Sequence, residues 1–235
     1  MATDFSSKQL SETYSEGVTA EGLSLRPVVL ELVGDVREKE VLDIGCGDGR
    51  YSIVFGENGA KVTAIDLSPH QIAIAMQKHS HPNINYSTGD VTSDIVEDNS
   101  IDLVFANLVV PDLDNLEKLG RLFFLSRRVL KVQGRLIFSV LHPLYLCSDQ
   151  DNFDKAVSFD PKGYFNEGSN YRAEALTNAG NKMTFDETHF SLTFISKLLR
   201  EQNFLIRSIS ESRQVPEKGM FLPKYLVFEC IPAEK

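Results

Sequence analysis

The stretch Val41–Arg50, with the sequence VLDIGCGDGR, decides the fold of this chain. A short apolar run leads into Gly45, Gly47 and Gly49, which stand at alternate positions. Residues without a Cβ can adopt positive φ and let a ligand approach the backbone, and the helix that follows offers free N–H groups. The pattern predicts a strand, a tight turn and a helix, with a ligand site at the carboxyl end of the strand. The alternative is a tight turn that binds nothing.

The residues around the glycines indicate which ligand this turn could take. A dinucleotide fingerprint, G-x-G-x-x-G, needs a third glycine at the position of Arg50. Asp43 and Asp48 flank the turn, and two carboxylates suit a cationic or zwitterionic ligand better than a pyrophosphate. The segment resembles the first motif of the class I S-adenosylmethionine-dependent methyltransferases, whose cofactor carries an ammonium and a sulfonium group.

Carboxylates also follow the next two predicted strands. Asp66 ends the strand Lys61–Ile65, near the spacing of about 20 residues at which nucleotide-binding folds place an acid for the ribose hydroxyls. Asp90 follows the strand Asn83–Ser87. The resemblance implies that Asp43, Asp66 and Asp90 contact the amino group, the ribose and the adenine of S-adenosyl-L-methionine in turn.

The same resemblance implies further cofactor contacts. They are expected at Gly45, Cys46 and Gly47 in the turn, at Leu67 and Val91 beside the adenine, at Arg26 near the carboxylate, and at Tyr14 and Asn107. Tyr14 is a candidate lid over the methionine end, or an exposed aromatic on a mobile arm. Arg26 is otherwise an ordinary surface arginine, and Asn107 otherwise a residue that turns the chain.

Two histidines are candidate catalytic bases, because the unperturbed pKa of histidine allows base chemistry near neutral pH. His142 ends the strand Arg135–Val140 in a His-Pro sequence that resembles a subset of small-molecule methyltransferases. The alternative is a histidine that fixes the loop through backbone bonds. His189 lies at the start of a predicted helix, Thr188–Gln202, whose dipole would favour the neutral ring. No histidine or cysteine spacing supports a metal site.

The composition changes between residues 144 and 187, where Asp, Asn, Gly and Ser are interleaved with aromatic residues. An unstructured loop of this length is uncommon inside a compact domain. We therefore expect a substrate cap inserted at 144–187. Its aromatic residues would line an apolar substrate pocket or pack a small core of the cap itself.

The predicted organisation is a helical lid segment over residues 1–36, a core formed by 37–143 and 188–235, and the cap. The resemblance implies an α/β, Rossmann-like, doubly wound sheet of seven strands. Six are expected to be parallel and one antiparallel at the end, with helices on both faces.

Composition limits the partners and the location. The formal net charge is −9 and no run of basic residues occurs, which disfavours a nucleic-acid partner. No apolar run is long enough to span a bilayer, and the N-terminus lacks the apolar core of a signal peptide. The three cysteines are widely spaced, as expected in a reducing cytoplasm. A monomer and a homodimer both remain open.

The function expected from this resemblance is S-adenosyl-L-methionine-dependent methylation of an oxygen, nitrogen or carbon atom of a small metabolite or natural product. S-adenosyl-L-homocysteine would be the product. One alternative is an NAD(P)-dependent oxidoreductase, which shares the strand–glycine–helix start and the acid at Asp66. Arg50 and the antiparallel finish argue against it. Another alternative is a protein that binds the cofactor without catalysis.

Overall fold

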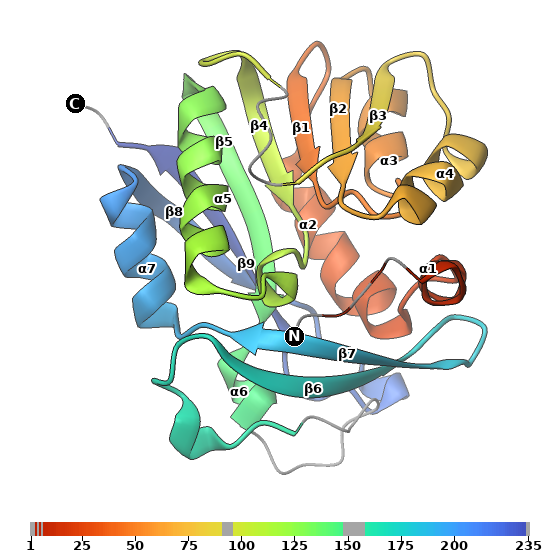
Figure 1. Cartoon of the computed structure of the whole chain (residues 1–235), viewed down its shortest axis with the longest axis vertical. Coiled ribbons are helices and arrows are strands. Elements are labelled where there is room, and N and C mark those ends of the chain that lie inside the picture. Colours follow the sequence, from red (N-terminus) through yellow and green to blue (C-terminus); the bar gives the residue numbers. More distant parts are fainter. Residues whose placement is uncertain (1–2, 4, 6, 91–95, 148–157, 234–235) are drawn as a thin grey trace.

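The computed structural model describes residues 3, 5, 7–90, 96–147 and 158–233. Within them it forms a seven-stranded sheet, in the order β3-β2-β1-β4-β5-β9-β8, and a two-stranded sheet of β6 and β7 (Figure 1). The strands are β1 (Glu40–Ile44), β2 (Lys61–Asp66), β3 (Ile84–Thr88), β4 (Ile101–Ala106), β5 (Leu130–Leu141), β6 (Ser169–Leu176), β7 (Lys182–His189), β8 (Phe204–Glu211) and β9 (Tyr225–Pro232). Neighbours among β1 to β5 run parallel, whereas β9 runs antiparallel to both β5 and β8. The expected α/β sheet with six parallel strands and one antiparallel strand is confirmed.

Helices cover both faces of the large sheet. The described α-helices are α1 (Lys8–Tyr14), α2 (Arg26–Val33), α3 (Ser52–Glu57), α4 (Pro69–Lys78), α5 (Leu116–Val129), α6 (Pro143–Cys147) and α7 (Leu192–Glu201), of which α1 and α6 lie near the hairpin at the lower end of the sheet. The apolar side chains of α2, α3 and α4 join one core cluster and those of α5 and α7 join the other. Figure 1 shows α5 and α7 on the near side of the sheet.

Alternation along the strands explains the two layers. Val41 belongs to the first cluster, while Leu42 and Ile44 belong to the second. Because successive side chains of a strand point to opposite faces, a run that is apolar at every position can fill both layers at once. This is why the central strands read as continuous apolar segments.

Strand β5 is longer than the sequence pattern indicates. It begins at Leu130, directly after α5, rather than at Arg135. Leu130 is fully buried and pairs with Ile101 of β4, so burial holds the backbone extended where the helical pattern predicted another turn. The register shift between Ile101 and Leu103 accommodates the extra residues.

The hairpin β6–β7 forms the two-stranded sheet and lies across the lower edge of the large sheet, where β1, β2 and β4 end (Figure 1). Tyr171, Ala173 and Phe185 are buried on one face of it, as alternation requires. The helix expected from Thr188 begins only at Leu192, because Ser191 caps it with a hydrogen bond from the Phe194 amide.

The tip of the hairpin is bound to the N-terminal segment. Val18 forms an antiparallel bridge with Thr177, and the Asn178 amide donates to the Gly17 carbonyl at 2.8 Å. The Glu16 carboxylate accepts hydrogen bonds from the Thr177 hydroxyl at 2.6 Å and the Asn181 amide group at 2.9 Å. The N-terminal segment and the hairpin therefore meet on the same side of the molecule.

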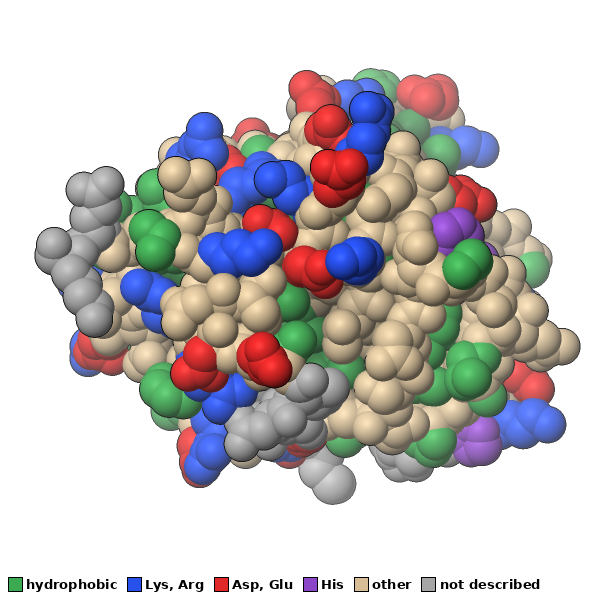
Figure 2. All heavy atoms as spheres, turned by 90° about the horizontal axis from the view of Figure 1, so that it is seen from above, with side chains coloured by type: hydrophobic (Ala, Val, Ile, Leu, Met, Phe, Trp, Pro, Cys, Tyr) green, Lys and Arg blue, Asp and Glu red, His purple; other side chains and the backbone are tan. Residues whose placement is uncertain are grey.

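The described surface is mixed in charge. Figure 2 shows basic and acidic side chains interspersed on the face seen from above. Exposed ion pairs such as Lys61–Glu40, 3.0 Å apart, also occur. None of the helices described here is long and apolar enough to cross a membrane.

Candidate active site

The glycine-rich turn forms the floor of the site. Gly45, Gly47 and Gly49 have φ values of 64°, 55° and 81°, in the left-handed region that side chains disfavour. A Cβ on Gly45 would lie 2.5 Å from a methyl carbon of Val109, which no packing permits. The backbone of this turn therefore has neighbours on one side and an open cavity on the other.

A cavity of about 270 Å³ opens at the carboxyl ends of the central strands. Its lining comes from the glycine turn, the ends of β2 and β4, the residues after β3, the N-terminal segment and the hairpin. The sequence-predicted residues that line it are Tyr14, Gly45, Gly47, Asp66, Leu67, Asp90 and Asn107. Segments far apart in the sequence thus meet around one space, as expected for an open parallel sheet.

Asp66 connects β2 with the glycine turn. One carboxyl oxygen accepts a hydrogen bond from the Gly47 amide at 2.9 Å and the other accepts from the Ser68 amide at 2.8 Å. Burial raises the pKa of Asp66, and these two amides oppose the shift. Leu67 beside it is 65% exposed, which leaves an apolar surface free at the mouth of the cavity.

Tyr14 covers the same turn. Its ring lies 3.5 Å from the position of a Cβ on Gly47, and it packs against the rings of Phe5 and Phe185. Burial raises the pKa of its hydroxyl well above the ordinary value. Tyr14 is therefore a half-buried wall of the cavity rather than an exposed aromatic.

Asp43 lies behind the turn and does not line the cavity, contrary to its expected contact with the cofactor amino group. Its carboxylate accepts a hydrogen bond of 2.5 Å from the Ser52 hydroxyl, and burial raises its pKa to about 7. Cys46 is also buried away from the cavity, and its amide donates to the Ile65 carbonyl. Both residues shape the turn from within.

Arg26 also lies outside the cavity lining. Its guanidinium donates to the backbone carbonyl of Arg50 at 3.3 Å and lies 5.4 Å from the ring centre of Tyr51. Arg50, in the third-glycine position, pairs with Asp48 at 2.9 Å and with Glu21 at 3.8 Å. Arg50 is thus the cation that pairs with acids beside the glycine turn, and Arg26 binds the backbone carbonyl of Arg50.

The remaining cofactor candidates lie after β3 and β4. Asp90 lines the cavity, whereas Val91 lies outside the described residues. The side-chain oxygen of Asn107 accepts a hydrogen bond of 2.8 Å from the Ser139 hydroxyl, which itself accepts from the Leu108 amide at 2.9 Å. This chain of bonds fixes the Asn107 side chain at the rim of the cavity.

Neither candidate histidine is among the residues that line the cavity. His142 accepts from the Leu144 amide through Nδ1 and lies 3.1 Å from Glu211 through Nε2. The geometry matches a histidine that fixes the loop.

His189 ends β7 rather than starting a helix. Its Nε2 lies 2.7 Å from the Tyr164 carbonyl, and burial lowers its pKa. The rings of Phe159 and Tyr164 pack against it, so these described aromatics of the 144–187 segment form a core around His189 instead of a substrate pocket.

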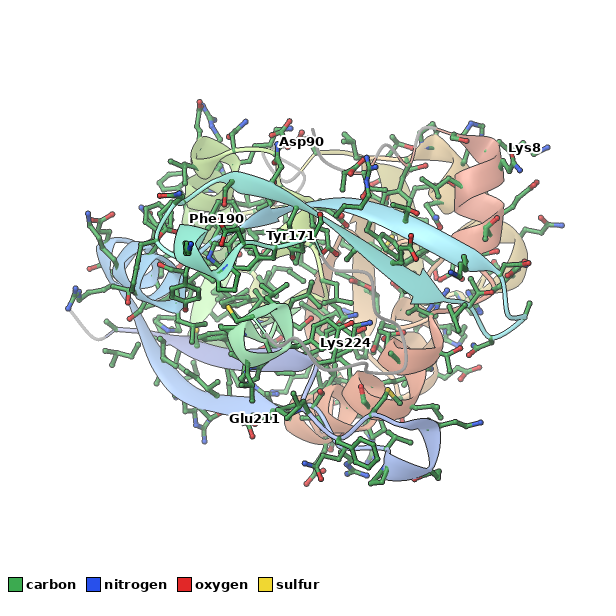
Figure 3. All side chains as sticks on the ribbon, turned by 90° about the horizontal axis from the view of Figure 1, so that it is seen from below. Lys8, Asp90, Tyr171, Phe190, Glu211 and Lys224 are labelled. Atoms are coloured by element: carbon green, nitrogen blue, oxygen red, sulfur yellow. The ribbon has the colours of Figure 1, made fainter. Side chains whose placement is uncertain are left out.

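The structure brings six charged residues to the cavity that the sequence pattern did not single out: Glu21, Asp112, Lys118, Glu174, Glu187 and Lys224. Tyr171 of β6 lies beside Glu187, and Lys224 precedes β9; both are labelled in Figure 3. Burial raises the pKa of Glu187 to about 7 and that of Asp112 well above its ordinary value. A usable signal was the alternation of β7, which places Glu187 on the same face as Phe185.

Two buried oxygen atoms in the cavity lining have no hydrogen-bond partner among the described residues: Oε1 of Gln71 and Oε2 of Glu187. Buried polar atoms are normally satisfied, so unpaired ones in a cavity wall suggest a ligand. Gln71 Oε1 lies 4.0 Å from the position of a Cβ on Gly47, at the cradle that a side chain would fill. These features fit a nucleoside cofactor with polar edges at the turn.

Residues 42–138 match the family model of a methyltransferase domain. The malonyl-[acyl-carrier protein] O-methyltransferase of Pectobacterium atrosepticum is 36% identical over 89 residues, which are 37% of this chain and 34% of that protein. The demethylmenaquinone methyltransferase of Tropheryma whipplei is 31% identical over 152 residues, which cover 59% of this chain and 61% of that protein. The chain thus aligns with less than two thirds of either curated relative.

A solved structure extends the similarity to most of the chain. A Listeria monocytogenes protein assigned as an S-adenosylmethionine-dependent methyltransferase superposes with a TM-score of 0.69 and 26% identity. The superposition covers 88% of this chain and 97% of that one. Residues 42–138 therefore match a methyltransferase domain, and the fold of an S-adenosylmethionine-dependent methyltransferase, with the glycine turn, the acid after β2 and the antiparallel β9, extends over most of the chain.

Proposed function

We propose that this protein transfers the methyl group of S-adenosyl-L-methionine to a small-molecule acceptor. The observation that carries the proposal is the single cavity in which the glycine turn, Asp66 and Asp90 meet a second wall made by the hairpin. The glycine turn, Asp66 and Asp90 suit a nucleoside, and the space beside the hairpin wall provides room for an acceptor.

The residues at the glycine turn would hold the cofactor. A carboxylate can accept from two hydroxyl groups at once, so Asp66 suits the ribose diol, and exposed Leu67 suits a face of the adenine. Asp90 would accept from the adenine amine, and Tyr14 would cover the methionine end. When bound, S-adenosyl-L-methionine supplies an electrophilic methyl group on a sulfonium.

The chain's own contribution is alignment. Holding two reactants in line can lower a reaction barrier by roughly 7–11 kcal/mol. A general base contributes less, because it typically raises the rate by roughly 10²–10⁴-fold. The lid segment proposed for residues 1–36 and the cap proposed for residues 144–187 enclose the cavity through Tyr14 and Phe185. They would exclude water from the reacting groups.

We further propose a location in the cytoplasm, supported by the three unpaired cysteines, Cys46, Cys147 and Cys230. The proposed acceptor is a metabolite or natural product rather than a nucleic acid, in keeping with the net charge of −9.

Calorimetry with S-adenosyl-L-homocysteine tests the cofactor assignment. We expect binding by the wild type and a loss of about tenfold or more in Asp66→Asn, because one charged acceptor of the ribose hydroxyls is replaced. Asp98→Ala, which removes an exposed partner of Arg128, is the matched control and should bind normally. Melting temperatures establish that each variant is folded. Equal affinity in wild type and Asp66→Asn would contradict the ribose assignment, and no binding by the wild type would refute the proposed function.

A further inference from the structure

The acceptor side of the cavity carries two acidic side chains on neighbouring elements. Glu187 of β7 and Asp112 of η2 (Val110–Asp112) both line it, and η2 packs against β7. Among the described residues, Oε2 of Glu187 is buried without a hydrogen-bond partner. Leaving a buried acceptor unpaired costs free energy, so Glu187 suits a ligand that donates hydrogen bonds.

The two acids form a series with Asp66. The charges of Glu187 and Asp66 both raise the pKa of Asp112, so Asp112 lies within electrostatic reach of the proposed ribose site and of the hairpin. Glu187 and Asp66 thus both lie within electrostatic reach of Asp112. An acceptor bound in front of Glu187 would have its reacting atom near the methyl donor.

The other groups that face Glu187 come from three elements. Tyr171 of β6 has its hydroxyl within bonding reach of the Glu187 carboxyl, and Lys224, before β9, exerts an opposing charge. The Lys224 ammonium lies over the ring of Tyr145 in α6, 5.0 Å from its centre. Figure 3 labels Tyr171 and Lys224, and it shows Tyr171 on the hairpin strand β6. Lys224 is the cation whose charge lowers the pKa of Glu187, while Lys118 and Glu174 also belong to the cavity lining.

Apolar side chains surround these charges. Val109, Leu113 and Phe185 line the same cavity. An acceptor bound there would contact an apolar wall and, in one region, the carboxyl groups of Glu187 and Asp112. Such a site selects a molecule with an apolar body and one cationic hydrogen-bond donor. A carboxylate-bearing molecule would face repulsion from both acids.

We propose that the acceptor is an amine with an apolar body, and that Glu187, assisted by Asp112, binds its ammonium and takes up one of its protons. This inference rests on the proposed function. An ammonium has no lone pair to attack the methyl group. Transfer of one proton from nitrogen to the Glu187 carboxylate leaves a neutral amine and a neutral acid. The amine lone pair then forms the new N–C bond as the C–S bond breaks, and the bonding pair returns to sulfur. The pKa of about 7 for Glu187 suits this exchange near neutral pH.

The experiment uses three probes of one shape on the protein saturated with S-adenosyl-L-homocysteine: phenethylamine, 2-phenylethanol and 3-phenylpropionate. We expect phenethylamine to bind about tenfold or more tightly than the other two, because only it forms a charge-assisted bond. Glu187→Gln keeps the shape and should abolish this preference. Asp186→Asn, whose parent carboxylate pairs with exposed Arg172 on the opposite face of β7, should retain it.

A second readout follows the labelled methyl group from S-adenosyl-L-methionine. We expect methylated phenethylamine, with turnover in Glu187→Gln lower by about 10²-fold or more. Preference for the alcohol or the carboxylate, no measurable affinity for the amine, or unchanged turnover in Glu187→Gln would each overturn the inference. Because S-adenosyl-L-homocysteine binding is measured first, its absence would refute the proposed function instead.

Discussion

Replacing Gly45 with alanine tests how tightly the glycine turn is built. Gly45 has a φ of 64°, and a Cβ there would lie 2.5 Å from the Cγ2 methyl carbon of Val109. The next nearest atoms of Val109 are 3.6 Å away, which is ordinary contact distance. The strain therefore has two separable sources, the backbone conformation and one methyl group.

The two sources give the expected size of the effect. A left-handed conformation costs an alanine about 1–2 kcal/mol, and overpacking a tight site costs about 1–3 kcal/mol. Gly45→Ala should thus lower the free energy of unfolding by about 2–5 kcal/mol. In a Val109→Ala background the crowded methyl group is gone, so the same change should cost only about 1–2 kcal/mol.

Urea unfolding with linear extrapolation measures these differences. Gly120→Ala is the matched control, because Gly120 lies within α5 and a Cβ there would meet nothing within 4 Å. It should be neutral or stabilising by about 0.5–1 kcal/mol. If Gly45→Ala costs the same with valine and with alanine at position 109, the contact with Val109 is not what constrains the turn.

Two more changes probe other parts of the site. Asp43 has a pKa of about 7 in the fold against an ordinary 3.8, so the folded protein keeps a proton that the unfolded chain releases, and its stability should fall as pH rises from 4 to 7. Asp43→Asn should flatten this dependence in unfolding experiments, and an unaltered pH profile would contradict the buried assignment. Glu16→Ala removes the acceptor of the Thr177 and Asn181 hydrogen bonds, so the Asn178 amide should exchange hydrogen faster, with α5 amides as an internal reference. Unchanged exchange at Asn178 would show that Glu16 does not hold the hairpin tip.

Much of the fold could be predicted because its signals are local. The glycine turn needs positive φ at Gly45 and Gly47, and only glycine adopts it readily. Asp66 could be placed at the cavity because it ends a parallel strand, and ligands of an open parallel sheet bind at the carboxyl ends of its strands. For the glycine turn and for Asp66, the residues that determine the position lie within a few positions of the functional residue itself.

The failures concern side chains whose neighbours come from distant elements. His142 looks like a base in sequence, yet Glu211 and the Leu144 amide occupy its ring nitrogens. Asp43 is part of the turn motif, but Ser52 and burial direct it inward. No local pattern reports such partners, because they are set by packing between elements.

Glu187 and Asp112 were missed for a related reason. Glu187 lies in a segment whose composition suggested a cap. Alternation could have placed it on the same face as Phe185, but its partner Tyr171 across the hairpin became visible only when β6 and β7 paired. Asp112 belongs to a single 3₁₀ turn, which is too short to show a periodic pattern of apolar residues in the sequence. The start of α7 was predicted too early, at Thr188, because the apolar periodicity of the helix extends back to Phe190, before the Ser191 cap.

The place of β9 has a consequence for how the molecule is made. Among the described strands β9 comes last along the chain, yet it lies between β5 and β8 and joins them through both of its edges. While the polypeptide is emerging from the ribosome, β8 has no partner and β5 presents an open edge, the kind of edge that invites association with other chains. Completion of the sheet therefore waits for the final strand, and the vulnerable interval of biosynthesis ends only when Tyr225–Pro232 slides into the gap.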